Sequence, residues 1–210
     1  MLNKKKLEII LSKLKDIEKP NPELEQYTIP SDLAAEILNI AYLSGKIENK
    51  VILDLGCGSG RLMIGAALIG AKKVIGIDVD KEAIETAKNN VKIARHMMNI
   101  EDQERIELHC MNISEWKTSV DTVIQNPPFG IQKLHADRVF LKKALECAKS
   151  IYSLHRHYEK SRGFLTKFIE KNGGKVEKII KFKFRIPYMF KFHKKPYVRY
   201  EVDLFVISRV

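Results

Sequence analysis

Two consecutive prolines follow the apolar run 120–125, and they limit what this part of the chain can form. Neither Pro127 nor Pro128 has a backbone N–H, and each fixes its own φ, so a strand cannot continue through them. The strand predicted at 120–125 therefore ends at Asn126, and the prolines form a stiff corner at its carboxyl end. In an open α/β sheet, ligands bind at the carboxyl ends of the strands.

This corner carries groups that suit a planar amine. The side-chain oxygen of Asn126 and the carbonyl of Pro127 can both accept hydrogen bonds from one exocyclic NH2 group. Phe129 offers a flat face to a planar ring. Asn126, Pro127, Pro128 and Phe129 are therefore the predicted catalytic residues, and a nucleobase amine is the expected acceptor.

A glycine-rich turn lies between a buried apolar run at 51–55 and a helical run at 61–68. Glycines at alternate positions let the backbone turn sharply and approach a ligand, and the helix N-terminus favours a negative group such as a carboxylate. The next strand, 73–78, ends in an acid placed to accept hydrogen bonds from ribose hydroxyls. The spacing differs from the G-x-G-x-x-G of dinucleotide-binding proteins. The predicted cofactor-binding residues here are Asp54, Gly56, Gly58, Gly60 and Asp78.

The glycine loop, the ribose acid and the Asn-Pro-Pro-Phe corner occur in one order, which resembles class I S-adenosylmethionine-dependent methyltransferases that methylate amines. A narrower resemblance, to the methyltransferase-like protein five family, covers nearly the whole chain. Members of that family install N6-methyladenosine on small-subunit ribosomal RNA. The matching segments are Leu24–Tyr27 with Pro30, Asp54–Gly58, Asn126–Gly130, Tyr152–His155, and Lys191–Lys195 followed by Glu201–Leu204.

Strand-like and helical runs alternate from residue 51 onward, which is typical of a parallel sheet with helices on both faces. The predicted fold class is α/β, a Rossmann-like sheet of seven strands. The resemblance implies the strand order 3-2-1-4-5-7-6 with the last strand antiparallel. We expect strands at 51–55, 73–78, 105–110, 120–125, 150–154, 175–185 and 197–208, and helices at 34–43, 60–69, 81–95, 137–149 and 157–171.

The chain, 1–210, is expected to be a single methyltransferase domain. Its first 30 residues are expected to form an N-terminal helical extension and a cofactor-closing segment. Apolar residues recur there at helical spacing among charges, which predicts an amphipathic helix. These residues are Leu7, Ile10, Leu11, Leu14 and Ile17.

The resemblance implies S-adenosyl-L-methionine as the cofactor. Gln26, Tyr27 and Thr28 would close over its methionine end, although a segment that only packs the following helix explains them equally well. At the position of the acid that binds the cofactor's adenine, this chain has Asn112, whose side-chain oxygen can still accept from the adenine amine. The resemblance also implies a small zinc-binding activator subunit, pairing with the edge strand at 105–110.

The net charge of +11 is unevenly distributed. Residues 156–199 contain 14 Lys and Arg against three Glu, whereas the remainder balances. A basic carboxyl-terminal third suits a polyanionic substrate, because phosphate contacts supply most non-specific affinity; lysines that merely solvate the surface are the alternative. The predicted RNA-binding residues are Lys191, His193, Lys194 and Lys195.

Three cysteines without a C-x-x-C pair fit a reducing compartment. No apolar run approaches the roughly 18 residues needed to span a bilayer. We therefore expect a cytoplasmic protein that does not bind a membrane. His155 and His157 lack further ligand clusters, so no metal site is predicted.

The leading hypothesis is an N6-adenine methyltransferase that acts on RNA, in particular small-subunit rRNA. In-line transfer would need alignment of the amine with the methyl donor rather than a catalytic base. A DNA adenine-N6 or a protein glutamine-N5 methyltransferase stays open as an alternative, although the basic third disfavours a glutamine substrate. A non-catalytic RNA-binding scaffold is a third hypothesis, and the intact motifs count against it.

Overall fold

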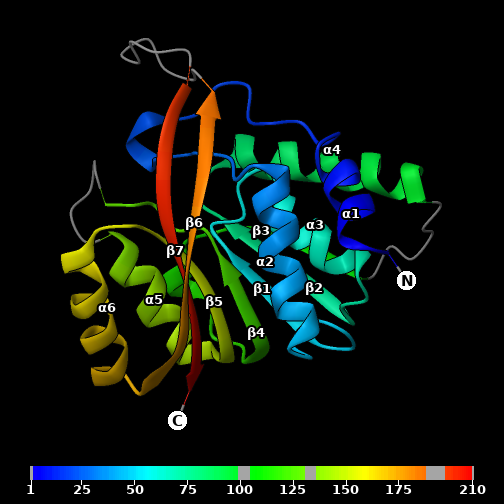
Figure 1. The fold of residues 1–210 in the computed structure, drawn as a ribbon. Coiled ribbons are helices and arrows are strands. Elements are labelled where there is room, and N and C mark those ends of the chain that lie inside the picture. The colour runs from blue at the N-terminus through cyan, green and yellow to red at the C-terminus, as the bar shows by residue number, and fades with distance from the viewer. Residues whose placement is uncertain (1, 99–104, 131–135, 188–196, 210) are drawn as a thin grey trace.

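The computed structural model describes residues 2–98, 105–130, 136–187 and 197–209. The strands in these ranges are β1 (Val51–Leu55), β2 (Lys73–Asp78), β3 (Ile106–Cys110), β4 (Val120–Gln125), β5 (Ala148–Arg156), β6 (Gly174–Pro187) and β7 (Tyr197–Arg209). They form one sheet in the order β3-β2-β1-β4-β5-β7-β6 (Figure 1). The strands from β3 to β5 are parallel, and β7 runs antiparallel between β5 and β6. The predicted fold class and strand order are confirmed.

Helices cover both faces of this sheet. They are α1 (Lys4–Leu11), α2 (Ser31–Leu43), α3 (Arg61–Leu68), α4 (Lys81–Met98), α5 (Ala136–Cys147) and α6 (Glu159–Lys171), with short 3-10 turns η1 (Pro22–Leu24) and η2 (Ile113–Glu115). Because strand side chains alternate, Ile52 joins a core with α1–α4, and Leu53 joins a second core with α5 and α6. None of the described helices is both long and apolar enough to cross a membrane.

The N-terminal helix is shorter than its apolar spacing predicts. Leu14 and Ile17 are buried as expected, but α1 ends at Leu11. After it, the side chain of Asn90 in α4 accepts from the backbone N–H of Lys15 at 2.8 Å and donates to its carbonyl at 2.8 Å. The Asn90 side chain therefore makes the hydrogen bonds to the Lys15 backbone that a longer helix would have made within itself.

The topology creates one crevice at the carboxyl edge of the parallel strands. From β1 the chain adds β2 and β3 on one side and then β4 and β5 on the other, so the direction in which strands are added reverses at β1. In sheets of this kind, ligands bind outside the carboxyl ends of the strands at this switch point. The residues that follow β1, end β2 and follow β4 are Gly56, Asp78 and Asn126, so the topology brings the predicted motifs to one place.

Candidate active site

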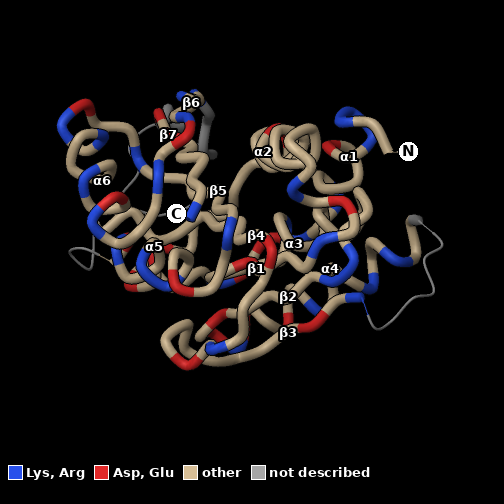
Figure 2. Tube along the Cα trace, turned by 90° about the horizontal axis from the view of Figure 1, so that it is seen from below, with Lys and Arg blue, Asp and Glu red and all other residues tan. Residues whose placement is uncertain are grey.

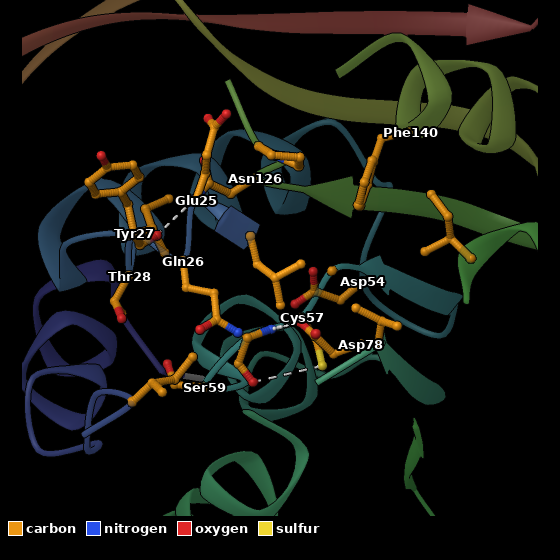
Figure 3. A pocket seen from close by; sticks show the side chains of 18 of the residues that line it. Glu25, Gln26, Tyr27, Thr28, Asp54, Cys57, Ser59, Asp78, Asn126 and Phe140 are labelled. Atoms are coloured by element: carbon orange, nitrogen blue, oxygen red, sulfur yellow. Dashed lines mark hydrogen bonds between the residues drawn. The ribbon is translucent and has the colours of Figure 1, made fainter. Parts of the chain in front are cut away.

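A cavity of about 400 Å³ lies at this switch point, within the usual range for small-molecule sites (Figure 3). The ends of β1, β2 and β4, the segment 23–29 and the first turn of α5 all contribute to its wall. Of the predicted site residues, those that line it are Gln26, Tyr27, Thr28, Asp54, Gly56, Gly58, Asp78, Asn112, Asn126 and Pro128. The structure therefore brings most of the predicted catalytic and cofactor-binding residues together.

The loop after β1 has left-handed backbone at Gly56, Gly58 and Gly60, with φ of 71°, 54° and 82°. A Cβ at Gly56 would lie 2.9 Å from the Phe140 ring, whereas a Cβ at Gly58 would meet nothing within 4 Å. Gly58 lines the cavity, so its open side leaves room for a ligand. Gly60 is not among the lining residues; a Cβ there would lie 3.1 Å from the Cβ of Ala87, so this glycine permits close packing of α4.

Two carboxyl groups lie in the wall of the cavity. Asp54 is only 2% exposed, and its Oδ2 accepts from the backbone N–H of Met63 at 3.1 Å. Burial raises the pKa of Asp54 to about 8, although the Met63 hydrogen bond opposes this rise. Asp78 accepts from the backbone N–H groups of Gly58, at 2.9 Å, and Asp80, at 3.0 Å, and burial also raises its pKa. Two buried acids without a cationic partner in the described part of the chain favour a ligand that carries positive charge or hydroxyl groups.

The segment before α2 closes one side of this cavity. The Gln26 side chain donates to Asp80 Oδ2 at 2.6 Å and accepts from the backbone N–H of Asn21 at 2.6 Å. Arg61, at the start of α3, donates to the carbonyl of Ile29 at 2.6 Å and to Asp16 at 2.8 Å. These contacts attach the segment before α2 to Asp80, which follows β2, and to the start of α3.

Asn126 has one end of its amide hydrogen-bonded and the other unpaired. Its Nδ2 donates to the carbonyl of Tyr27 at 3.2 Å, while its Oδ1 is buried and has no hydrogen-bond partner (Figure 3). A carbonyl can only accept, so the NH2 group must be the end that faces Tyr27. The contact therefore presents Asn126 Oδ1 as an acceptor. The other two predicted catalytic residues do not line the cavity: Pro127 is buried, and Phe129 packs against the core on the α1–α4 face.

Asn112 lines the cavity but already has partners for its oxygen. Its Oδ1 accepts from the backbone N–H of Ser114 at 3.0 Å and from the Ser114 hydroxyl at 2.9 Å, which forms a capping box on η2 with Glu115. The oxygen that we expected to accept from an adenine amine is therefore occupied. The amide NH2 of Asn112 is the group left for a ligand.

The other residues that the sequence singled out are the predicted RNA-binding residues and two histidines. Lys191, His193, Lys194 and Lys195 fall outside the described residues, so their RNA contacts stay predictions. His155 contacts Ser153 Oγ at 2.7 Å, and His157 contacts Asp203 at 2.7 Å. The described residues contain no cluster of three or more side chains that could hold a metal ion.

The sequence did not point to several residues of the wall. Phe140 and Val139 come from α5, whose apolar spacing indicates only that one face is buried. Arg61 is 7% exposed, and its Nε is a buried donor without a partner. The one sequence signal for Arg61 was its position directly after the glycine loop. Its burial is informative as well, because an arginine is rarely buried without a reason.

Comparison with known proteins places this site among methyltransferases. The model of the ribosomal protein L11 methyltransferase (PrmA) family matches residues 36–127. An uncharacterized protein of Methanocaldococcus jannaschii is 44% identical, with 100% of this chain and 96% of that protein covered. The rRNA N(6)-adenosine-methyltransferase METTL5 of Danio rerio is 36% identical, with 95% of each chain covered. The crystal structure of a candidate RNA methyltransferase from Pyrococcus horikoshii is 42% identical, with a TM-score of 0.90 and 100% and 99% of the two chains covered.

Proposed function

This chain belongs to the family of rRNA N(6)-adenosine-methyltransferases that includes METTL5 of Danio rerio, and we propose that it methylates N6 of an adenine in RNA, in particular small-subunit rRNA. The observation that carries this proposal is Asn126 Oδ1, a buried acceptor without a partner at the wall of the cavity. Leaving such an atom unsatisfied costs about 1–3 kcal/mol. An amine that donates to it removes that cost, which fits an exocyclic NH2 group as the acceptor of the methyl group.

S-adenosyl-L-methionine is the methyl donor in this proposal, and the residues present fit it. Asp78 offers its carboxylate to ribose hydroxyls, and Gly58 leaves space for a close approach. Asp54 suits a ligand with positive charge, because a nearby cation favours the ionised form of a buried acid. We assign the unpartnered Nε–H of Arg61 to the carboxylate of the methionine portion. Gln26, Tyr27 and Thr28 form the closing side.

When bound, the sulfonium supplies an electrophilic methyl group with a neutral thioether as its leaving group. Asn126 Oδ1 and the Pro127 carbonyl would each accept one N–H of the adenine amine, which would favour a pyramidal nitrogen with its lone pair free to attack the methyl group. The chain's contribution is thus alignment and electrostatic complementarity. After transfer the nitrogen is strongly acidic and loses its proton to water, so no side chain is assigned as a base. Phe129 is assigned to stack on the base, which must be unstacked from RNA before it enters the pocket.

Three further assignments accompany this function. We propose one methyltransferase domain, 1–210, in which residues 1–30 form the extension that closes the cofactor cavity. The small zinc-binding activator subunit is proposed to add a strand to β3, which lies at one edge of the sheet. A cytoplasmic location is proposed because Cys57, Cys110 and Cys147 are all unpaired.

Labelled S-adenosylmethionine tests the function directly. The protein, with and without a candidate activator, is incubated with deproteinised RNA, DNA and a protein fraction, followed by nucleoside and amino-acid analysis. We expect label in N6-methyladenosine of RNA, and at least a hundredfold loss in Asn126→Ala by analogy with removal of other preorganised hydrogen-bonding groups, which costs about 10²–10³ in rate. Asn172→Ala, at the distant end of α6, is the control. Label only in DNA or protein, or full activity in Asn126→Ala, would contradict the proposal.

A further inference from the structure

Two exposed aromatic side chains stand out beside the carboxyl end of β5. Tyr158 is 51% exposed and Phe164 is 45% exposed, and no other aromatic residue with a described side chain is as accessible. Large aromatic rings are usually buried because each removes 150–250 Å² of surface from water. Two that remain accessible near a cavity indicate a surface that contacts a partner.

Each of these rings has an arginine above its face. The guanidinium carbon of Arg138 lies 4.1 Å from the centre of the Phe164 ring, and that of Arg156 lies 4.8 Å from the centre of the Tyr158 ring. They are the two cation–π contacts within the described ranges of the chain. Stacking of Arg138 on the Phe164 ring leaves its planar fork of donors available to phosphate.

This surface continues into the candidate active site. Arg138 is followed by Val139, which is 58% exposed and also lines the cavity. The two arginine–aromatic pairs belong to neighbouring elements, because Asp137 in the first turn of α5 approaches His155 near the end of β5 to 3.7 Å. We call Arg138, Val139, Arg156, Tyr158 and Phe164 the stacking surface.

The charge around the stacking surface is mainly positive. Figure 2 shows Lys and Arg at several positions along α6. Arg162 is paired with Asp203, and Lys160, Lys167 and Lys171 still outnumber Glu159 and Glu170. Aromatic faces beside cations are what single-stranded nucleic acid requires, since bases stack on the rings and phosphates pair with the cations. A peptide partner would use the rings but would gain little from so many cations.

We infer that the stacking surface binds unpaired RNA nucleotides adjacent to the target adenine, an inference that rests on the proposed function. The bases on one side of the target stack on Phe164 and Tyr158, and Arg138 contacts a flanking phosphate. Stacking there would offset part of the cost of removing the target adenine from its neighbours, which is a few kcal/mol.

The test uses the full chain with S-adenosylhomocysteine and fluorescein-labelled oligoadenylate of twelve nucleotides, followed by anisotropy. Phe164→Leu and Tyr158→Leu keep an apolar side chain but remove the ring. Each should weaken binding roughly ten- to a hundredfold, the range for loss of one stacked base, without changing its salt dependence. Arg138→Gln should instead reduce the slope of log affinity against log salt by about 0.7, the value for one phosphate contact on a single strand.

The control is Leu43→Ala, at the end of α2, which removes another exposed apolar side chain and should bind like wild type. Circular dichroism establishes that each variant folds. Wild-type affinity in Phe164→Leu and Tyr158→Leu, or no binding of the oligonucleotide by the wild type, would overturn the inference. If the wild type methylates RNA while these variants are unaffected, the stacking surface alone is wrong; if the wild type labels no RNA, the proposed function is wrong.

Discussion

Asp54→Asn should make the stability of the cofactor-free protein less sensitive to pH. The change keeps the size of the side chain and an oxygen that can accept from the Met63 N–H, but it removes the ionisable group. In the folded protein, burial raises the pKa of Asp54 from 3.8 to about 8. A carboxyl group with a raised pKa holds its proton in the folded chain after the unfolded chain has lost it.

The magnitude follows from that difference in pKa. Each pKa unit corresponds to about 1.4 kcal/mol. Between about pH 4 and pH 8 the unfolded chain has released the Asp54 proton and the folded chain has not, so the wild-type contribution falls by about 1.4 kcal/mol per pH unit. Above about pH 8 both states are ionised, and the accumulated loss levels off at no more than about 6 kcal/mol. The variant has no such dependence.

Urea unfolding at each unit from pH 5 to pH 9 measures the effect. The free energy of unfolding of Asp54→Asn minus that of wild type should rise with pH up to about pH 8 and then become constant. A packing cost of the amide shifts this difference curve by a constant and leaves its slope unchanged. A flat curve between pH 5 and pH 8 would refute the argument that Asp54 is neutral in the cofactor-free protein.

A second readout connects this titration to binding. A cationic ligand in the cavity favours the carboxylate, so S-adenosylmethionine should bind with release of a proton at pH 7. Calorimetry in two buffers of different ionisation enthalpy measures that proton. Asp54→Asn should release none from this site, and should bind the cofactor more weakly.

Two further predictions concern backbone strain and acid stability. Gly58→Ala and Gly45→Ala both place a methyl group on left-handed backbone with nothing within 4 Å, so each should cost about 1–2 kcal/mol in thermal unfolding. Only Gly58→Ala, whose methyl group borders the cavity, should weaken cofactor binding, and equal affinity in the two variants would contradict that. Burial opposes ionisation of Asp203, but hydrogen bonds from Arg162 and His157 outweigh it and lower its pKa. Its stabilisation is therefore present above about pH 4 and lost as pH falls; acid unfolding followed by circular dichroism should be less steep in Asp203→Asn, and identical curves would count against this.

The elements of the sheet were predictable because their signals are local. The runs 51–55, 73–78 and 120–125 have the bounds that the structure gives to β1, β2 and β4. A glycine turn, an acid or a proline pair ends each run or follows it directly. The parallel order then places their carboxyl ends together, so the motif residues could be assigned to one site without knowing any contact between them.

The contacts that orient the site could not be predicted, because they join segments far apart in sequence. Tyr27 and Asn126 are 99 residues apart, and their hydrogen bond decides which end of the Asn126 amide is left unpaired. Asn90 and Lys15, whose backbone it binds after the end of α1, are likewise 75 residues apart. The capping role of Asn112 was local and could have been found, since Glu115 three residues later completes a capping box.

Three costly groups of this fold lie in the wall of one cavity. Asp54 is a buried acid, Asn126 Oδ1 is an acceptor without a partner, and Arg61 Nε is a donor without a partner. Away from a binding site, replacing such buried polar groups with apolar side chains is often neutral for folding stability or increases it, so these groups are readily replaced there. Their common location therefore indicates that a ligand satisfies them together. A ligand that binds only the folded state stabilises it by RT ln(1 + [L]/Kd). The methyl donor and the adenine should therefore each raise the free energy of unfolding of the wild type. Each should raise it less in a variant that lacks the side chain assigned to bind that ligand.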